Sequence, residues 1–77
     1  MANVIVYSTP DCPWCTKAKE FLEQNNVEFE AKNVVEDHDA QHEMLDKSGQ
    51  MGVPVLDIDG TIIVGFDVER IKQALKL

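Results

Sequence analysis

The order of apolar and polar residues along the chain predicts alternating strands and helices. Residues 3–7 form a largely apolar run rich in β-branched side chains, which indicates a strand covered on both faces. Apolar residues then recur at helical spacing from Pro13 to the Asn25-Asn26 pair, so we expect a helix that begins at a proline and ends at a left-handed cap. Apolar and charged residues alternate from residue 27, which predicts a half-buried strand ending near residue 35.

A second helix is predicted after this strand. The acidic residues 36–39 suit the positive end of a helix dipole, and Gly49 suits its end. Met44 and Leu45 are the expected core side of this helix.

The last third of the chain predicts a hairpin followed by a helix. Residues 53–58 and 61–64 are mostly apolar and flank Asp59-Gly60, a pair typical of a type I′ turn. Asp67 is a natural N-cap for a final helix with one apolar face.

The resulting order, β-α-β-α-β-β-α, predicts an α/β fold. Two strands joined through a helix are parallel with a right-handed crossover, whereas the hairpin strands are antiparallel. We therefore expect a four-stranded mixed sheet flanked by helices on both faces, in a single domain that spans residues 1–77.

Composition and charge exclude several classes of function. The chain has 7 Lys and Arg against 14 Asp and Glu, a net charge of −7, which argues against nucleic acid as a partner. No apolar run approaches the roughly 18 residues that span a membrane, and we see no secretory signal. We expect a cytoplasmic protein, without a membrane partner and monomeric.

The sequence Cys12-Pro13-Trp14-Cys15 carries the candidate chemistry. It lies where the first predicted strand gives way to a helix, and the free N–H groups of a helix start favour a thiolate. Residues three apart on a helix are neighbours, so a disulfide can close between the cysteines. Cys12 would attack a disulfide and Cys15 would resolve the mixed disulfide. The alternative of two inert, packed cysteines fits this position less well.

A zinc site is a second alternative. Cys12 and Cys15 with His38 and His42 have the C-x2-C and H-x3-H spacings of zinc ligands. The segment between the pairs is longer than in a zinc finger and predicts a helix and a strand, so we expect no metal and two solvated histidines.

The chain resembles the glutaredoxin family of the thioredoxin superfamily. Residues 7–15 look like the segment that carries that family's active site, and Gly52-Val53-Pro54 looks like the segment with its cis-proline. Gly65-Phe66-Asp67 stands where the family has a glycine turn before its last helix. The resemblance covers essentially the whole chain and implies a thioredoxin fold.

The resemblance also implies roles for individual residues. Cys12 matches the nucleophile and Cys15 the resolving thiol. Val53 matches the residue whose backbone pairs with the substrate, and Pro54 matches the cis-proline that faces the disulfide. Asp67 matches a residue that holds the γ-glutamyl group in members that use glutathione. We therefore expect a substrate-binding surface of Pro13, Trp14, Val53, Pro54, Gly65, Phe66 and Asp67 around the two cysteines.

Two departures from the family concern the electron donor. Glutathione-dependent members usually carry Gly-Gly before the acidic residue and a cation three residues before the nucleophile, whereas this chain has Gly65-Phe66 and Thr9. Lys17 and Lys47 are the remaining candidates to bind the glycyl carboxylate, and neither stands at the expected position. The Gly-Phe pair is similar to redoxins that thioredoxin reductase recharges.

Together, these features predict a thiol–disulfide oxidoreductase that reduces protein disulfides and has no tightly bound cofactor. We expect a protein reductase such as thioredoxin reductase to recharge it. Two alternatives remain: glutathione as co-substrate and electron donor, or a binding module that holds a [2Fe–2S] cluster between two chains through Cys12 and glutathione.

Overall fold

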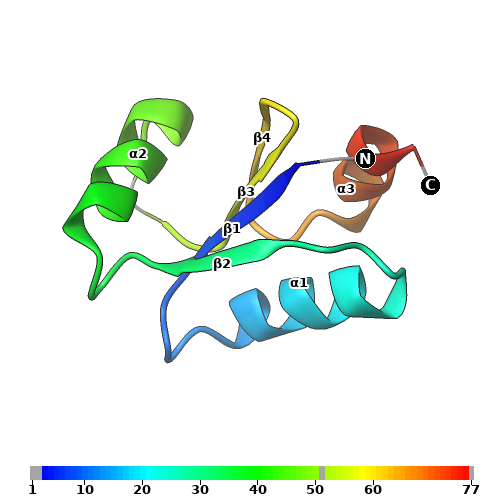
Figure 1. Cartoon of the computed structure of the whole chain (residues 1–77), viewed down its shortest axis with the longest axis horizontal. Helices are drawn as coiled ribbons and strands as arrows, with labels where there is room; N and C mark the ends of the chain where they lie inside the picture. The colour runs from blue at the N-terminus through cyan, green and yellow to red at the C-terminus, as the bar shows by residue number, and fades with distance from the viewer. Residues whose placement is uncertain (1–2, 51, 77) are drawn as a thin grey trace.

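The computed structural model of the chain describes residues 3–50 and 52–76, and its elements follow the predicted order (Figure 1). The elements are β1 (Val4–Ser8), α1 (Pro13–Gln24), β2 (Glu30–Asn33), α2 (His38–Ser48), β3 (Val55–Ile58), β4 (Thr61–Val64) and α3 (Val68–Leu75). In this part of the chain, no helix has the length and apolar character needed to cross a membrane.

The four strands form one mixed sheet in the order β2-β1-β3-β4. β1 runs parallel to β2 and antiparallel to β3, and β4 runs antiparallel to β3. In this register Val6 of β1 lies opposite Ala31 of β2 on one side and Leu56 of β3 on the other. The predicted mixed topology, with a parallel first pair and a terminal hairpin, is confirmed.

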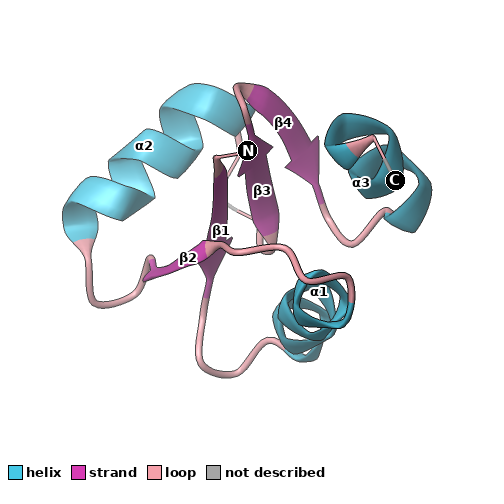
Figure 2. Cartoon of the chain, turned by 45° about the vertical axis from the view of Figure 1, so that its right-hand side comes forward, coloured by secondary structure: helices cyan, strands magenta, loops and turns pink. Residues whose placement is uncertain are grey.

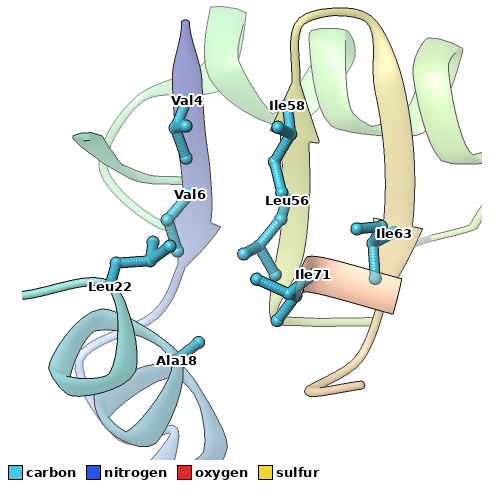
Figure 3. Close-up of a cluster of buried hydrophobic side chains, with 8 residues drawn as sticks. All are labelled: Val4, Val6, Ala18, Leu22, Leu56, Ile58, Ile63 and Ile71. Atoms are coloured by element: carbon cyan, nitrogen blue, oxygen red, sulfur yellow. The ribbon is translucent and has the colours of Figure 1, made fainter. Parts of the chain in front are cut away.

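Helices cover both faces of the sheet, as predicted (Figure 2). On one face, side chains of β1, β3 and β4 point toward those of α1 and α3 (Figure 3). This cluster consists of Val4, Val6, Ala18, Leu22, Leu56, Ile58, Ile63 and Ile71. On the other face, α2 packs through Ala40 and Met44 against a cluster that includes Tyr7, Val34 and Val55.

Local chemistry fixes the turns and helix ends close to where the sequence predicts them. Asp37 caps α2 by accepting a hydrogen bond from the Ala40 N–H over 3.1 Å, and Gly49 ends the helix in the left-handed region at φ +72°. Asp59 and Gly60 both have positive φ, +50° and +91°, as a type I′ turn requires.

Three expectations from the sequence are wrong in detail. The strand predicted over residues 53–58 begins only at Val55. β2 begins only at Glu30, because its first pair in the ladder is Ile5 with Glu30; Val27 and Phe29 instead pack against the core from the loop before it. Leu45 is 40% exposed and does not belong to the core side of α2.

A polar network fastens α2 to the sheet. The hydroxyl of Tyr7, a fully buried residue of β1, donates to Glu43 over 3.0 Å and accepts from the Lys47 ammonium over 3.0 Å. Lys47 also donates to the Asp57 carboxylate over 2.6 Å. The hydrogen bonds to Asp57 and Tyr7 raise the pKa of Lys47, and burial raises the pKa of Tyr7. Lys47 is therefore a structural cation between α2 and β3.

Candidate active site

The two cysteines lie at the junction of β1 and α1. Cys12 is the N-cap of α1, and its Sγ accepts a hydrogen bond from the backbone N–H of Cys15 over 3.1 Å. Pro13 occupies the first helical position, where its missing N–H costs nothing. Both cysteines are free thiols; Cys12 is half-buried, whereas Cys15 is completely buried. The pair is thus asymmetric in exposure.

The surroundings of Cys15 hold it in the thiol form. Burial, followed by its hydrogen bond with Cys12, raises the pKa of Cys15 from 9.0 to about 11. A hydrogen bond with the Thr9 backbone and the charge of Lys19 act in the opposite direction on this pKa. The buried Cys15 thiol therefore needs a stabilising group before it can react as a thiolate.

A groove of about 300 Å³ brings together three segments that are distant in the sequence. It is lined by Trp14, Val53, Pro54, Gly65 and Phe66. The Val53-Pro54 peptide bond is cis, as the resemblance implied, and the Gly65 N–H donates to the Pro54 carbonyl over 2.8 Å. Gly65 has φ +84°, a conformation that glycine adopts without strain. Five of the predicted substrate-binding residues therefore share one apolar surface, which includes Trp14, one of the two residues between the cysteines.

An aromatic cluster forms one wall of this groove. The Phe66 ring lies 6.3 Å from the Trp14 ring and 6.1 Å from the Phe21 ring, the latter in an edge-on arrangement at 70°. The Lys17 ammonium lies 4.5 Å from the centre of the Trp14 ring. Sequence reasoning missed these contacts, although the three-residue spacing of Trp14 and Lys17 on a helix indicates neighbours.

The remaining predicted residues have defined positions. Asp67 caps α3 by accepting a hydrogen bond from the Arg70 N–H over 3.2 Å, and its carboxylate also lies 3.8 Å from the Arg70 guanidinium. Pro13 is exposed at the start of α1. Lys47 and Lys17 are the two candidates to bind the glycyl carboxylate of glutathione. Lys47, on α2, is paired with Asp57 of β3, and the ammonium of Lys17 lies over the Trp14 ring.

The zinc hypothesis gains no support from the geometry. Across residues 3–50 and 52–76, no group of three or more His, Cys, Asp and Glu side chains comes together as metal ligands would. His38 and His42 are exposed on α2, as expected for a solvated helix face. A hollow of about 560 Å³ between β2 and the start of α2 has His38 in its lining but neither cysteine nor His42.

Comparisons with known proteins agree with this fold. The Glutaredoxin family model matches residues 4–63. A protein of Clostridium pasteurianum described as an uncharacterised glutaredoxin-like 8.6 kDa protein in the rubredoxin operon is 48% identical over 71 residues, which cover 92% of this chain and 95% of that protein. Glutaredoxin 3 of Escherichia coli K12 is 36% identical over 67 residues, 87% of this chain and 81% of that protein.

A solved structure extends the likeness to three dimensions. The crystal structure of the thioredoxin-like protein BC3987 superposes with a TM-score of 0.88 at 38% identity, covering 94% of this chain and 99% of that chain. The fold and site thus define a protein of the thioredoxin-fold class. Within that class, the chain belongs to the glutaredoxin family, and this membership implies thiol–disulfide oxidoreductase activity.

Proposed function

We propose that the chain reduces protein disulfides through Cys12 and Cys15, with Cys12 as the nucleophile and Cys15 as the resolving thiol. The observation that carries this proposal is the asymmetry of the pair. Cys12 is accessible at the start of α1 and receives the Cys15 N–H on its sulfur, whereas Cys15 is fully buried. A hydrogen-bond donor directed at a sulfur at a helix start favours negative charge there.

The reaction proceeds in two exchanges. The Cys12 thiolate attacks one sulfur of the substrate disulfide, so that a mixed disulfide forms and the other substrate sulfur leaves as a thiolate and takes up a proton. Cys15 then loses its proton and attacks the Cys12 sulfur. The Cys12–Cys15 disulfide forms, the second substrate thiol is released, and two electrons have passed to the substrate.

The groove between Trp14 and Phe66 is the proposed docking surface for the substrate chain. Its walls are apolar, and Val53 and Pro54 form one side of it. In this proposal, the Val53 backbone pairs with the segment that carries the substrate cysteine, as in strand addition. Pro13 borders the surface, and Asp67 lies next to its Phe66 wall.

The two cysteine variants test the assignment of roles. With insulin as substrate and dithiothreitol as reductant, Cys12→Ser should abolish catalysed reduction. Cys15→Ser, reduced beforehand and freed of dithiothreitol, should instead accumulate a mixed disulfide with insulin that mass spectrometry detects. The proposal fails if Cys12→Ser, rather than Cys15→Ser, accumulates the adduct.

For the electron donor, we propose a protein reductase such as thioredoxin reductase. Glutathione carries two carboxylates, and a good site for it needs a cation for the glycyl end. Thr9 is uncharged, Lys47 is engaged with Asp57 and Tyr7, and the net charge of −7 opposes an anionic ligand. A missing charge-assisted contact of about 1.5–3 kcal/mol weakens binding by roughly ten- to over a hundredfold.

Glutathione is the rival donor because members of this family use it as a co-substrate. The discriminating measurement is the steady-state rate of insulin reduction with two recycling systems, glutathione with glutathione reductase and thioredoxin reductase with NADPH. We expect faster turnover with thioredoxin reductase. Turnover with millimolar glutathione that equals or exceeds it would refute the proposed donor and leave the roles of Cys12 and Cys15 untouched.

A further inference from the structure

The second exchange poses a chemical difficulty that the site must solve. Cys15 is completely buried, and its pKa is raised to about 11, yet it must react as a thiolate. The groove on the Trp14 side serves substrate docking and has no titratable side chain in its lining. A charge that assists Cys15 is therefore to be sought on another side of α1.

Lys19 occupies that position. It follows Cys15 by four residues on α1, so the two side chains share one face of the helix. The lysine is half-buried, and it lines a hollow of about 210 Å³ between α1, the loop after β1 and β2. The lining of this hollow consists of Ser8, Thr9, Pro10, Lys19, Ala31 and Asn33.

Thr9 connects this hollow to the buried sulfur. Thr9 lines the hollow, and its backbone lowers the pKa of Cys15. The charge of Lys19 acts on this pKa in the same direction, and Lys19 is the cation in the lining of the hollow. A volume of this size holds several water molecules, because one water occupies about 30 Å³. The hollow thus offers a positive charge and room for water beside Thr9.

We propose that Lys19 is a positioning residue for the resolving step: its ammonium, in the hollow beside Thr9, stabilises the Cys15 thiolate as the proton passes to water. Cys15 then attacks the Cys12 sulfur, the mixed disulfide breaks, and its electron pair leaves with the substrate sulfur. In this step Lys19 acts through its charge and transfers no atom. This inference rests on the proposed function, because it assigns a charge to the second of its two exchanges.

The test separates the two exchanges with a chromogenic disulfide. Reduced protein is mixed with one equivalent of 5,5′-dithiobis(2-nitrobenzoate). The first equivalent of coloured thiolate reports attack by Cys12, and the second reports resolution by Cys15. Cys15→Ser should release only the first. If the wild-type protein shows no second phase, or Cys12→Ser keeps the first, the proposed function itself fails.

The variants Lys19→Met and Lys19→Arg address the inference. In Lys19→Met the second phase should slow about 2- to 5-fold at pH 7, as expected for loss of one partly exposed charge interaction, and its pH profile should move upward by a few tenths of a pH unit. Lys19→Arg should restore both the rate of the second phase and its pH profile. Lys72→Gln on α3 is the matched control, since it removes one positive charge from an exposed position and should leave both phases unchanged.

Two results would overturn the inference. One is a second phase in Lys19→Met with the wild-type rate and pH profile. The other is a first phase in Lys19→Met that slows by the same factor as the second. That result would show that the charge of Lys19 acts on the anionic reagent and not on Cys15. Circular dichroism confirms that each variant is folded before its rates are compared.

Discussion

The backbone N–H of Cys15 donates a hydrogen bond to the Sγ of Cys12 over 3.1 Å, so Cys15 is part of the electrostatic environment of the Cys12 sulfur. This relationship arises because Cys12 is the N-cap of α1, and the N–H three residues later is one that the helix leaves unpaired. The same turn that exposes one sulfur buries the other. The difference in exposure between the two cysteines, on which their proposed roles rest, therefore follows from the geometry of a helix start.

The first prediction concerns the order of alkylation. In the reduced protein at neutral pH, iodoacetamide should modify Cys12 first, because Cys15 is fully buried and its pKa is raised to about 11. Peptide mapping by mass spectrometry over a time course gives the order. In urea-unfolded protein, both cysteines should react at similar rates. Faster modification of Cys15 in the folded protein would contradict the assignment.

The second prediction concerns Phe66, which joins the groove to the core. Phe66→Ala removes its contacts with Trp14 and Phe21 and should lower the free energy of unfolding by about 1–3 kcal/mol, less than the cost of truncating a fully buried phenylalanine. Urea unfolding followed by the fluorescence of Trp14, the only tryptophan, measures the loss.

Phe66→Leu is the matched control, since it keeps an apolar side chain at the same place. It should recover most of the stability but not the aromatic contact with Trp14. If the groove docks the substrate, Phe66→Ala should also raise KM for a protein disulfide more than it lowers kcat. A large loss of kcat with unchanged KM would speak against docking at this wall.

The third prediction concerns the ion pair between Lys47 of α2 and Asp57 of β3. Lys47→Met leaves the Asp57 carboxylate, whose side chain is 12% exposed, without its cation, and should cost about 1–3 kcal/mol of unfolding free energy. The double variant Lys47→Met, Asp57→Asn should recover part of this loss, because no buried charge is then left unpaired. Urea midpoints of the three proteins give the comparison; a Lys47→Met variant as stable as the wild type would show that the pair contributes nothing.

The fourth prediction is a loss of stability at alkaline pH. Burial is the main cause of the raised pKa of Cys15 and of Tyr7. The hydrogen bond to Asp57 is the main cause of the raised pKa of Lys47. The folded chain therefore holds these protons more tightly than the unfolded chain. Their contributions are complete below the unfolded values of 9.0, 10.0 and 10.5, and are lost as pH rises through the folded values.

Urea midpoints measured between pH 7 and pH 11 test this sign. The midpoint should be level up to about pH 9 and fall above it. Tyr7→Phe should flatten the part of the decline above pH 10, and Cys15→Ser the part that begins near pH 9. A midpoint that rises with pH in this window would contradict the linkage.

Much of the fold could be predicted from the sequence because it depends on neighbours in the chain. The helix start at Pro13, the left-handed end at Gly49 and the turn at Asp59-Gly60 are set by backbone preferences of those residues and lie where predicted. The half-exposed Cys12 at a helix start follows in the same way. The order of elements then fixed the mixed topology, since few connections are possible for it.

The candidate site itself was only partly accessible from the sequence. The cysteine pair is a local motif, but the place of Val53, Pro54 and Phe66 beside it came from resemblance to a family. Nothing in their spacing indicates that residues about forty and fifty positions after Cys12 line one groove with Trp14.

The sequence by itself determined the order of the elements, most helix ends and the place of the cysteine pair at a helix start; only the tertiary structure decided which distant side chains meet. Leu45 is exposed although its residue type favours the core, and Lys47 binds Asp57 rather than remaining free for a ligand. The hollow at Lys19 likewise exists because α1 lies beside the loop after β1 and β2. Backbone preferences act over a few residues, whereas burial and charge pairing depend on how whole elements pack, and a linear pattern does not specify that packing.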